Sequence, residues 1–501
     1  MNTSPTSEHS PYADVRETHS GLVLLCGERA YKVKRPVVTG FLDFGSRERR
    51  ERAIARELEL NRRLSPDVYL GISHLTDLDG GPGEPVLVMR RLPDRARLSE
   101  LLDDPAATRT ALTDLADLLA RFHDRADRGP DIDRAARVDA VRGRWADLLS
   151  GLTDPPIDPA VTERITALVT RYLDGRKPLL DNRIADGRIV DGHGDLHAGD
   201  IFALPDGFRI IDCLDFDDDL RHLDRLDDIA FLAMDLEFLH HPRHAEELLD
   251  HYCALTNDPV PASLRHHYIA YRAIVRARVN CIRHEQGAPE AAAHAVRHTE
   301  IAVSHLDKAT VRLALVGGLP GTGKSTLAAA LAAATGALVV SSDTVRAELR
   351  STGELPGHSG EYGRGAYSPR AKDRVYTEML DLARTHLSTG RSVVLDASWT
   401  DPRHRDRAAT LATETSTDPI ELCCHAPQSI AAERIAARTG SNSEATAAIA
   451  AAMAETTPPW PTATVVDTTT SAEATLTQAL RAWNSPTRRS PDTPVTASRR
   501  P

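Results

Sequence analysis

The stretch VRLALVGGLPGTGKST, residues 311–326, joins an apolar segment to a glycine-rich loop. Residues 311–316 predict a buried strand, and the alanine- and leucine-rich residues 327–335 predict a helix after the loop. The spacing G-x-x-x-x-G-K-S, from Gly318 to Ser325, lies between these two elements, as a phosphate-binding loop requires. Glycines in such a loop let backbone N–H groups turn toward phosphate oxygens at a helix N-terminus. The sequence therefore predicts a nucleotide site, and a chance glycine-rich turn is the alternative.

The loop and the first helical turn supply the predicted nucleotide-binding residues. These are Gly318, Leu319, Pro320, Gly321, Thr322, Gly323, Lys324, Ser325 and Thr326. We expect Lys324 to bridge the β- and γ-phosphates of ATP and the Ser325 hydroxyl to ligate Mg²⁺. ATP and Mg²⁺ are thus the cofactors that the motif predicts.

Acidic and basic side chains follow the next two predicted strands. Residues 338–342 predict a strand that ends at Asp343, and Arg346 lies three residues later, on the first turn of the next predicted helix. Because the carboxyl end of a parallel strand faces the ligand crevice, Asp343 is placed to accept the proton of an attacking hydroxyl. Arg346 could hold an anionic substrate group or the transferring phosphate. Asp396 ends the strand predicted at 392–395 and could hold Mg²⁺ through water or orient the nucleophile.

Two arginines further along the chain form a candidate lid. Arg434 and Arg438 lie one helical turn apart on a helix predicted to open near Ser429. Such a pair can close over the phosphates and stabilise the transferring charge. The alternative is a solvated helix face, which the spacing does not exclude.

Several runs in this half resemble the small P-loop kinases, among them gluconate kinase, polynucleotide 5′-kinase and the zeta-toxin kinases. The runs are SSDTVRAEL, AYSPRAKDRVYTEML, GRSVVLDASWTDPRHR and ERIAAR with SNSEA after it. The resemblance covers about residues 310–470. It implies that Asp343 is the catalytic base and that Arg346 contacts the substrate. It points to phosphorylation of a hydroxyl and leaves the acceptor open.

The first half of the chain carries a different motif. Its elements are predicted as hairpin strands Gly21–Cys26 and Arg29–Lys34, a helix at 47–64, a strand at 86–91 and helices from about 109 to 180. His-Gly-Asp-Leu-His, residues 193–197, lies between short strands predicted at 188–191 and 208–211, and Asp212 follows the second strand.

This pattern resembles the aminoglycoside phosphotransferase relatives of protein kinases. The resemblance implies that Asp195 is the catalytic base and that Asp212 holds Mg²⁺. The lysine that pairs with the α- and β-phosphates should lie in AYKVKR, where Lys32 is the first choice and Lys34 the next. Glu57, on the first long helix, fits the glutamate that orients this lysine.

The first half departs from that family in two respects. Asp200 stands where the family has an asparagine that serves as the second metal ligand, and we find no Gly-x-Gly-x-x-Gly loop. A carboxylate at residue 200 can still bind Mg²⁺, but it adds negative charge near Asp195 and Asp212. Weak or absent phosphotransfer in this half is therefore an open alternative.

The tandem arrangement resembles a bacterial group in which an aminoglycoside-phosphotransferase-like protein is fused to a P-loop kinase. The first-half runs GFLDF, ELELNRRLSPDVYLG and IIDCLDFDDDLRHLDRLDDIAFLAMDLE carry this likeness. The implied fold is a two-lobed kinase-like α+β domain, followed by a P-loop α/β domain with a parallel sheet. We predict a mobile N-terminus at 1–19, domains at 20–307 and 308–484, and a disordered tail at 485–501.

Composition narrows the class of protein. The chain has 501 residues, of which 41% are hydrophobic and 27% charged, as in ordinary globular proteins. Aromatic residues are only 4% and the net charge is −11, so a nucleic-acid partner is not expected. The six cysteines form no Cys-x-x-Cys pair and no long apolar run occurs, which predicts a cytoplasmic protein without a membrane segment.

Together these features predict a kinase that uses ATP and Mg²⁺ to phosphorylate a hydroxyl of a small molecule, chiefly through its second domain. Two alternatives stay open: a nucleotide-binding regulator without turnover, and a kinase of nucleic-acid 5′-hydroxyls. The oligomeric state does not follow from the sequence.

Overall fold

The structure is a computed structural model, and it describes residues 12–17, 21–38, 43–76, 80–355, 368–437 and 447–485. Its contacts divide the chain into two compact units. Unit 1 comprises Met1–Thr166, Leu180–Val260 and Leu264–Leu306, and unit 2 comprises Ala167–Leu179, Pro261–Ser263 and Asp307–Pro501. Unit 2 therefore takes in two short segments that lie within the range predicted for the first domain.

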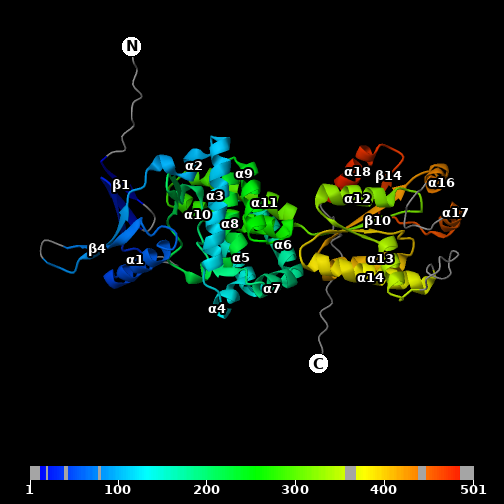
Figure 1. Ribbon diagram of the computed structural model, residues 1–501, viewed down its shortest axis with the longest axis horizontal. Helices are drawn as coiled ribbons and strands as arrows, with labels where there is room; N and C mark the ends of the chain where they lie inside the picture. Colours follow the sequence, from blue (N-terminus) through cyan, green and yellow to red (C-terminus); the bar gives the residue numbers. More distant parts are fainter. Residues whose placement is uncertain are drawn as a thin grey trace, which may run out of the picture. The chain divides into compact units, whose positions relative to one another are not determined.

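An antiparallel sheet forms the first part of unit 1, with strand order β1-β2-β3-β5-β4 (Figure 1). Its elements are β1 (Ala13–Glu17), β2 (Gly21–Cys26), β3 (Arg29–Lys34), α1 (Arg47–Asn61), β4 (Tyr69–Leu75) and β5 (Glu84–Arg90). The predicted hairpin is confirmed, since Gly21 pairs with Lys34 and Cys26 with Arg29. Strand β1 lies inside the segment predicted to be mobile, where it pairs with β2.

Helix α1 packs on this sheet and brings its residues to the strands. Ser46 caps the helix by accepting a hydrogen bond from the backbone N–H of Arg49. Ile54 of α1 packs with Leu25, Tyr69 and Leu87 in one apolar cluster. The buried face of α1 also carries Glu57, which is therefore directed toward the sheet.

The rest of unit 1 is mainly helical. The helices of this part of the chain are α2 (Leu98–Leu101), α3 (Pro105–Arg125), α4 (Pro130–Asp133), α5 (Val138–Ser150), α6 (Pro159–Gly175), α7 (Lys177–Ala185), α8 (Arg225–Phe238), α9 (Pro242–Leu255), α10 (Ala262–Glu285) and α11 (Glu290–Ala309). Of these, α6, α7, α10 and α11 each have some residues in unit 2. Two short ladders pair β6 (Ile189–Asp191) with β9 (His222–Asp224) and β7 (Ile201–Leu204) with β8 (Gly207–Ile210). The His-Gly-Asp-Leu-His motif lies in the connection between β6 and β7.

Unit 2 is built on a parallel sheet with strand order β11-β12-β10-β13-β14. The strands are β10 (Arg312–Gly317), β11 (Leu338–Ser341), β12 (Val393–Asp396), β13 (Asp418–His425) and β14 (Thr464–Asp467). The order confirms a P-loop type of α/β sheet, with the predicted first strand, β10, at its centre. The apolar side chains of β10 alternate between two cores, because successive residues of a strand point to opposite faces.

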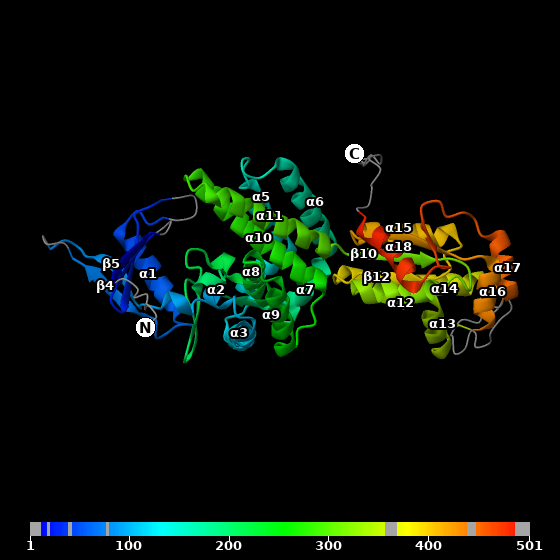
Figure 2. The ribbon, with the colours of Figure 1, turned by 90° about the horizontal axis from the view of Figure 1, so that it is seen from above.

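Helices cover both faces of this sheet (Figures 1 and 2). They are α12 (Lys324–Thr335), α13 (Ser342–Ser351), α14 (Pro369–Ser388), α15 (Pro402–Glu414), α16 (Gln428–Ala436), α17 (Ala447–Thr456) and α18 (Ala472–Asn484). On one face α12 and α18 pack against Ala314 and Val316. On the other face α13, α14 and α15 pack against Leu313 and Leu315.

Two element boundaries differ from the prediction. Strand β11 ends at Ser341, and Asp343 lies in the first turn of α13 rather than at the strand end. Arg346 consequently lies in the second turn of that helix. The reason is that Ser341 caps α13, with its side chain accepting from the backbone N–H of Asp343.

Among the helices that the structure describes, none is both long and apolar enough to cross a membrane.

Candidate active sites

The phosphate loop of unit 2 runs from β10 to the N-terminus of α12. Gly318, Gly321 and Gly323 have φ angles of 132°, 82° and 84°, which side chains other than glycine rarely adopt. Packing adds a second requirement, since a Cβ on Gly321 would collide with the carbonyl oxygen of Ala431. A Cβ on Gly318 would lie 2.6 Å from the carbonyl oxygen of Cys424. These glycines therefore fix the path of the loop against its neighbours.

Lys324 folds back over the loop at the first position of α12. Its Nζ donates a hydrogen bond to the carbonyl oxygen of Leu319 at 3.0 Å, and the Thr322 hydroxyl donates to the same oxygen at 2.8 Å. The first-turn N–H groups of a helix have no intrahelical partners. An anion at this position would meet those N–H groups, the positive end of the helix dipole and the Lys324 ammonium.

Asp396 lies at the end of β12, next to the start of α12. Its carboxylate accepts hydrogen bonds from Ser325 and, at 3.3 Å, from the Ser341 hydroxyl. Burial raises the pKa of Asp396, and Ser325 and Lys324 oppose that rise. Carboxylate and hydroxyl oxygens are the ligands that Mg²⁺ prefers. Ser325 and Asp396 therefore fit the predicted metal, whose charge would neutralise phosphate oxygens here.

Asp343 and Arg346 lie one helical turn apart on α13. Nη1 of Arg346 donates to Oδ1 of Asp343 at 2.6 Å. The Arg346 side chain is 10% exposed and that of Asp343 is 30% exposed, so the carboxylate is the part that solvent reaches. Burial raises the pKa of Asp396, and the negative charge of Asp343 raises it further. The two carboxylates therefore interact electrostatically.

Arg434 approaches the same loop from α16. Its Nη2 donates to the carbonyl oxygen of Thr468 at 2.8 Å. A Cβ built on Gly323 would lie 3.7 Å from Arg434 Nη1, so the guanidinium is beside the phosphate loop. Arg438, the second residue of the predicted lid, lies outside the described residues.

In unit 1, two lysines of β3 share one buried glutamate of α1. Nζ of Lys32 lies 2.7 Å from Oε1 of Glu57, and Nζ of Lys34 lies 2.7 Å from Oε2. Lys32 also contacts Oδ1 of Asp212 at 2.6 Å, and Lys34 contacts Oδ2 of Asp215 at 2.7 Å. Burial disfavours the ammonium form of Lys32, but Asp212 and Glu57 outweigh it and raise its pKa well above the usual value. Both lysines are thus held as cations.

Asp212 has a positive φ of 59°, which aspartate tolerates better than most residues. Its backbone N–H donates to the Tyr69 hydroxyl at 3.1 Å, and the next N–H, of Cys213, donates to Oδ1 of Asn61 at 2.9 Å. Helix α1 and strand β4 therefore fix this turn. The Asp212 side chain is 41% exposed and could also contact a metal ion.

Asp195 follows a short loop whose backbone is hydrogen-bonded to a side chain of α8. Asp228 is fully buried and accepts from the backbone N–H of His193 at 2.7 Å and of Gly194 at 2.9 Å. The Asp195 N–H donates to Nδ1 of His193 at 3.3 Å. The Asp195 side chain itself is 36% exposed. Hydrogen bonds thus hold the backbone before Asp195, while the Asp195 carboxylate stays accessible to solvent.

Asp200 is paired with cationic groups. Its Oδ2 lies 3.0 Å from Nε2 of His197, and its Oδ1 lies 3.9 Å from Nη1 of Arg97. Burial opposes protonation of His197, but Asp200, followed by Asp195, raises its pKa to about 10. The extra negative charge at residue 200 is thus compensated locally, which the sequence does not reveal.

Several residues near the two sites were missed at the level of sequence. In unit 1 they are Asn61, Tyr69 and Asp228, and in unit 2 they are Ser341 and Tyr376. Most of them act through hydrogen bonds to residues distant in the chain. The hydrogen bond from Asp212 to Tyr69, for example, joins residues 143 positions apart.

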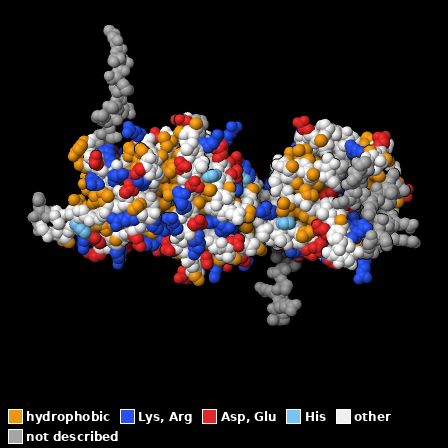
Figure 3. All heavy atoms as spheres, in the orientation of Figure 1, with side chains coloured by type: hydrophobic (Ala, Val, Ile, Leu, Met, Phe, Trp, Pro, Cys, Tyr) orange, Lys and Arg blue, Asp and Glu red, His pale blue; other side chains and the backbone are white. Residues whose placement is uncertain are grey.

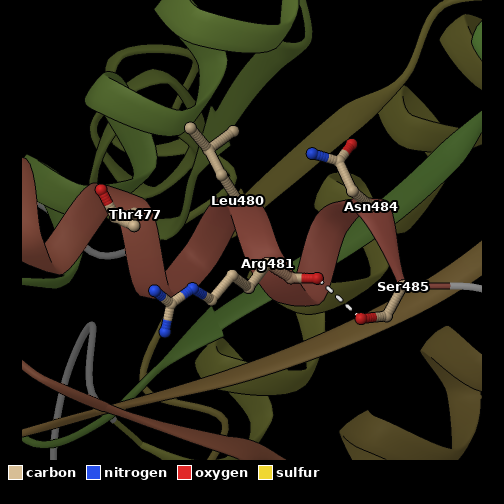
Figure 4. Close-up of a pocket in the computed structure, with 5 residues that line it drawn as sticks. All are labelled: Thr477, Leu480, Arg481, Asn484 and Ser485. Atoms are coloured by element: carbon tan, nitrogen blue, oxygen red, sulfur yellow. Dashed lines mark hydrogen bonds between the residues drawn. The ribbon is translucent and has the colours of Figure 1, made fainter.

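Within the described ranges, no group of three His, Cys, Asp or Glu side chains is arranged to hold a metal ion. Figure 4 shows a pocket on the surface of α18, lined by Thr477, Leu480, Arg481, Asn484 and Ser485. None of these five is a predicted site residue.

Two families match this chain, one in each half. The family described as "Phosphotransferase enzyme family" matches residues 29–267. The family described as "AAA domain" matches residues 313–459. Uncharacterized proteins of Mycobacterium tuberculosis and Mycobacterium bovis are 49% identical over 478 residues, which cover 95% of this chain and 96% of theirs. The chain belongs to the family of these mycobacterial proteins.

Within this family the chain carries a phosphotransferase-type domain followed by a P-loop domain. The predicted resemblance and the predicted fold class are thereby confirmed. Solved structures similar to parts of it include a gluconokinase from Sinorhizobium meliloti, at 19% identity over 34% of this chain and 90% of that one, TM-score 0.27. A GDP complex of an aminoglycoside 2′-phosphotransferase is 15% identical over 60% of this chain and 94% of that one, TM-score 0.37.

Proposed function

We propose that unit 2 transfers the γ-phosphoryl group of ATP to a hydroxyl of a small molecule. One observation carries the proposal: Lys324, Asp396 and Asp343 come together around a loop that is shaped to hold phosphates. The loop glycines and the start of α12 would hold the triphosphate, with Lys324 on its β- and γ-phosphates. The family matches support phosphotransfer in general.

In the proposed reaction Asp343 receives the proton of the acceptor hydroxyl as its oxygen attacks the γ-phosphorus. The bond from this phosphorus to the β–γ bridging oxygen breaks, and ADP leaves with the electron pair. Lys324 and Arg434 stabilise the charge that develops on the transferring group. Arg346 holds Asp343 in place through their 2.6 Å hydrogen bond and would contact the acceptor. Ser325 and Asp396 would hold Mg²⁺, which supplies charge neutralisation.

For unit 1 we propose nucleotide binding. Lys32, oriented by Glu57, would contact the α- and β-phosphates, while Asp212 and Asp200 would hold Mg²⁺ and Asp195 would serve as base. Because Asp200 is already paired with His197, the imidazole competes with a metal ion for its carboxylate. This supports a unit 1 whose phosphotransfer is weaker than that of unit 2.

A small-molecule acceptor is favoured over a nucleic acid. On the face drawn in Figure 3, Lys and Arg side chains of unit 1 are interspersed with Asp and Glu side chains. A protein that binds a nucleic-acid backbone usually gathers its positive charge on one face. The net charge of −11 points the same way.

Phosphotransfer from labelled ATP into a metabolite extract, followed by mass spectrometry, tests the proposal. We expect one or a few small hydroxyl compounds to gain a phosphoryl group. Labelling of 5′-hydroxyl oligonucleotides instead would favour the nucleic-acid kinase. Stoichiometric nucleotide binding with no labelled product would favour a regulator and contradict the proposed activity.

A further inference from the structure

The turn that follows β12 contains a residue with an unusual backbone conformation. Trp399 lies three residues beyond Asp396, the last residue of β12, and has a φ angle of 53°. Residues with large side chains rarely adopt this left-handed region, and they keep it only where the surrounding contacts hold them there. Trp399 is 1% exposed, and its indole N–H donates to the carbonyl oxygen of Leu395 at 3.2 Å. Further contacts must hold the backbone of the turn itself.

The hydroxyl of Tyr376, on α14, supplies such a contact. It accepts a hydrogen bond from the backbone N–H of Trp399 at 3.1 Å and lies 3.3 Å from the Ser398 hydroxyl. Other groups hold the Tyr376 ring: the His404 ring stacks on it with the centroids 3.9 Å apart, and the Trp399 ring packs edge-on at 5.0 Å. His404 in turn lies 2.8 Å from Oδ1 of Asp373. The ring packing thus presents the hydroxyl to the turn.

The same turn contacts the start of the phosphate loop. The carbonyl oxygen of Ser398 accepts a hydrogen bond from the backbone N–H of Gly318 at 3.2 Å. A Cβ on Gly317 would lie 3.3 Å from the Cβ of Trp399, so the turn also packs against the end of β10. Asp396, the proposed metal ligand, lies just before the turn in the chain. The position of the turn therefore bears on both the phosphate loop and the metal ligand.

We infer that Tyr376 is a positioning residue of unit 2: its hydroxyl holds the turn after β12, and this turn holds the phosphate loop through Gly318. The inference rests on the proposed function of unit 2 and adds to it a residue that acts through the backbone of the turn. Without the hydroxyl, the buried N–H of Trp399 loses its acceptor. The backbone of the turn then relaxes toward an ordinary φ, which moves the Ser398 carbonyl away from Gly318.

Amide hydrogen exchange of the full-length protein, without nucleotide, tests this connection directly. Tyr376→Phe removes the hydroxyl and keeps the ring that packs against His404 and Trp399. Exchange in the peptide that contains Gly318 should become about tenfold faster, because that N–H loses its fixed acceptor. The matched control is Tyr172→Phe, which removes another buried hydroxyl of unit 2, one that lies 3.4 Å from Ser263. It should leave exchange at Gly318 unchanged.

The dependence of phosphotransfer on ATP concentration gives a second readout. Tyr376→Phe should raise the KM for ATP about threefold to tenfold and change kcat by less than about threefold, because the loop holds the triphosphate while Asp343 and Lys324 are retained. Ser398→Ala removes only the contact between the two hydroxyls and leaves the bond from the Trp399 N–H in place. It should therefore speed exchange at Gly318 by a smaller factor, about threefold.

The outcomes separate this inference from the proposed function. Unchanged exchange at Gly318 in Tyr376→Phe overturns the positioning role, and so does an increase of equal size throughout unit 2, which would indicate a general loss of stability. If Tyr376→Phe does not fold, exchange in Ser398→Ala decides the matter, and no change at Gly318 overturns the inference. Absence of any labelled product counts against the kinase proposal, whereas exchange at Gly318 still shows whether Tyr376 holds the loop.

Discussion

We expect the ammonium group of Lys324 to stabilise the negative charge that develops on the γ-phosphate during transfer. Lys324→Ala in the full-length protein should lower phosphotransfer by about two to three orders of magnitude, as removal of a donor to a developing charge does elsewhere. Phosphotransfer from labelled ATP measures this. Lys308→Ala, in the last turn of α11, removes the same charge outside the site and serves as the control. Activity of Lys324→Ala within a few-fold of the wild type would contradict the assigned role.

Substitution of Asp343 should affect turnover and nucleotide binding differently. In the proposed reaction the carboxylate of Asp343 receives the acceptor proton, whereas the triphosphate would be held by the loop and Lys324. Asp343→Asn should therefore lower kcat by about two to four orders of magnitude and change the Kd for ATP by less than about twofold. Steady-state kinetics and calorimetric titration measure the two quantities. A comparable loss of both would show that Asp343 supports the nucleotide site instead of acting as a base.

At the scale of elements, the short turn that carries Asp200 should respond to pH. The pKa of His197 is raised to about 10 in the folded protein, chiefly by Asp200 against the effect of burial. Its unfolded value is about 6.5. Because the folded pKa is the higher one, the stability from this pair is fully present below about pH 6.5 and is lost as the pH rises toward about 10.

Asp200→Asn isolates this effect. The wild type should exceed the variant in free energy of unfolding at pH 6, and the difference should shrink by pH 10. Denaturant-induced unfolding of both proteins at pH 6 and pH 10 measures this difference in free energy. The unfolding transition of unit 1 is followed by spectroscopy, separately from that of unit 2. A difference that stays constant between pH 6 and pH 10 would mean that the His197–Asp200 pair is not the source of the stability.

The elements also show where sequence reasoning succeeds and where it stops. The phosphate loop, the hairpin of β2 and β3, and β12 could be predicted because their signals are local: glycine spacing, a two-residue turn and an apolar run. The helical turn in which Arg346 lies could not be predicted. It depends on where α13 begins, and that start is set by a single capping hydrogen bond to Ser341. The partners of Lys34, Asp212 and Asp200 were likewise hidden, since tertiary packing brings them together over long separations in the chain.

At the scale of the whole molecule, the chain carries two units that each hold a candidate phosphate site. In unit 2 the groups around the phosphate loop include Asp343, whose side chain is 30% exposed, and Lys324, which folds back over the loop. In unit 1 the carboxylate of Asp200, one of the two proposed metal ligands, is paired with His197. The central claim is therefore that unit 2 carries the phosphotransfer and that unit 1 contributes little of it.

The most direct test compares three full-length proteins in the metabolite-extract assay with labelled ATP: the wild type, Lys324→Ala and Asp195→Asn. Each substitution removes one proposed active-site residue from one unit and leaves the other unit unchanged. The account predicts that the wild type and Asp195→Asn label the same acceptor at rates within a few-fold, and that Lys324→Ala loses nearly all of the label. Loss of labelling in Asp195→Asn with activity kept in Lys324→Ala would place the reaction in unit 1 and contradict the account.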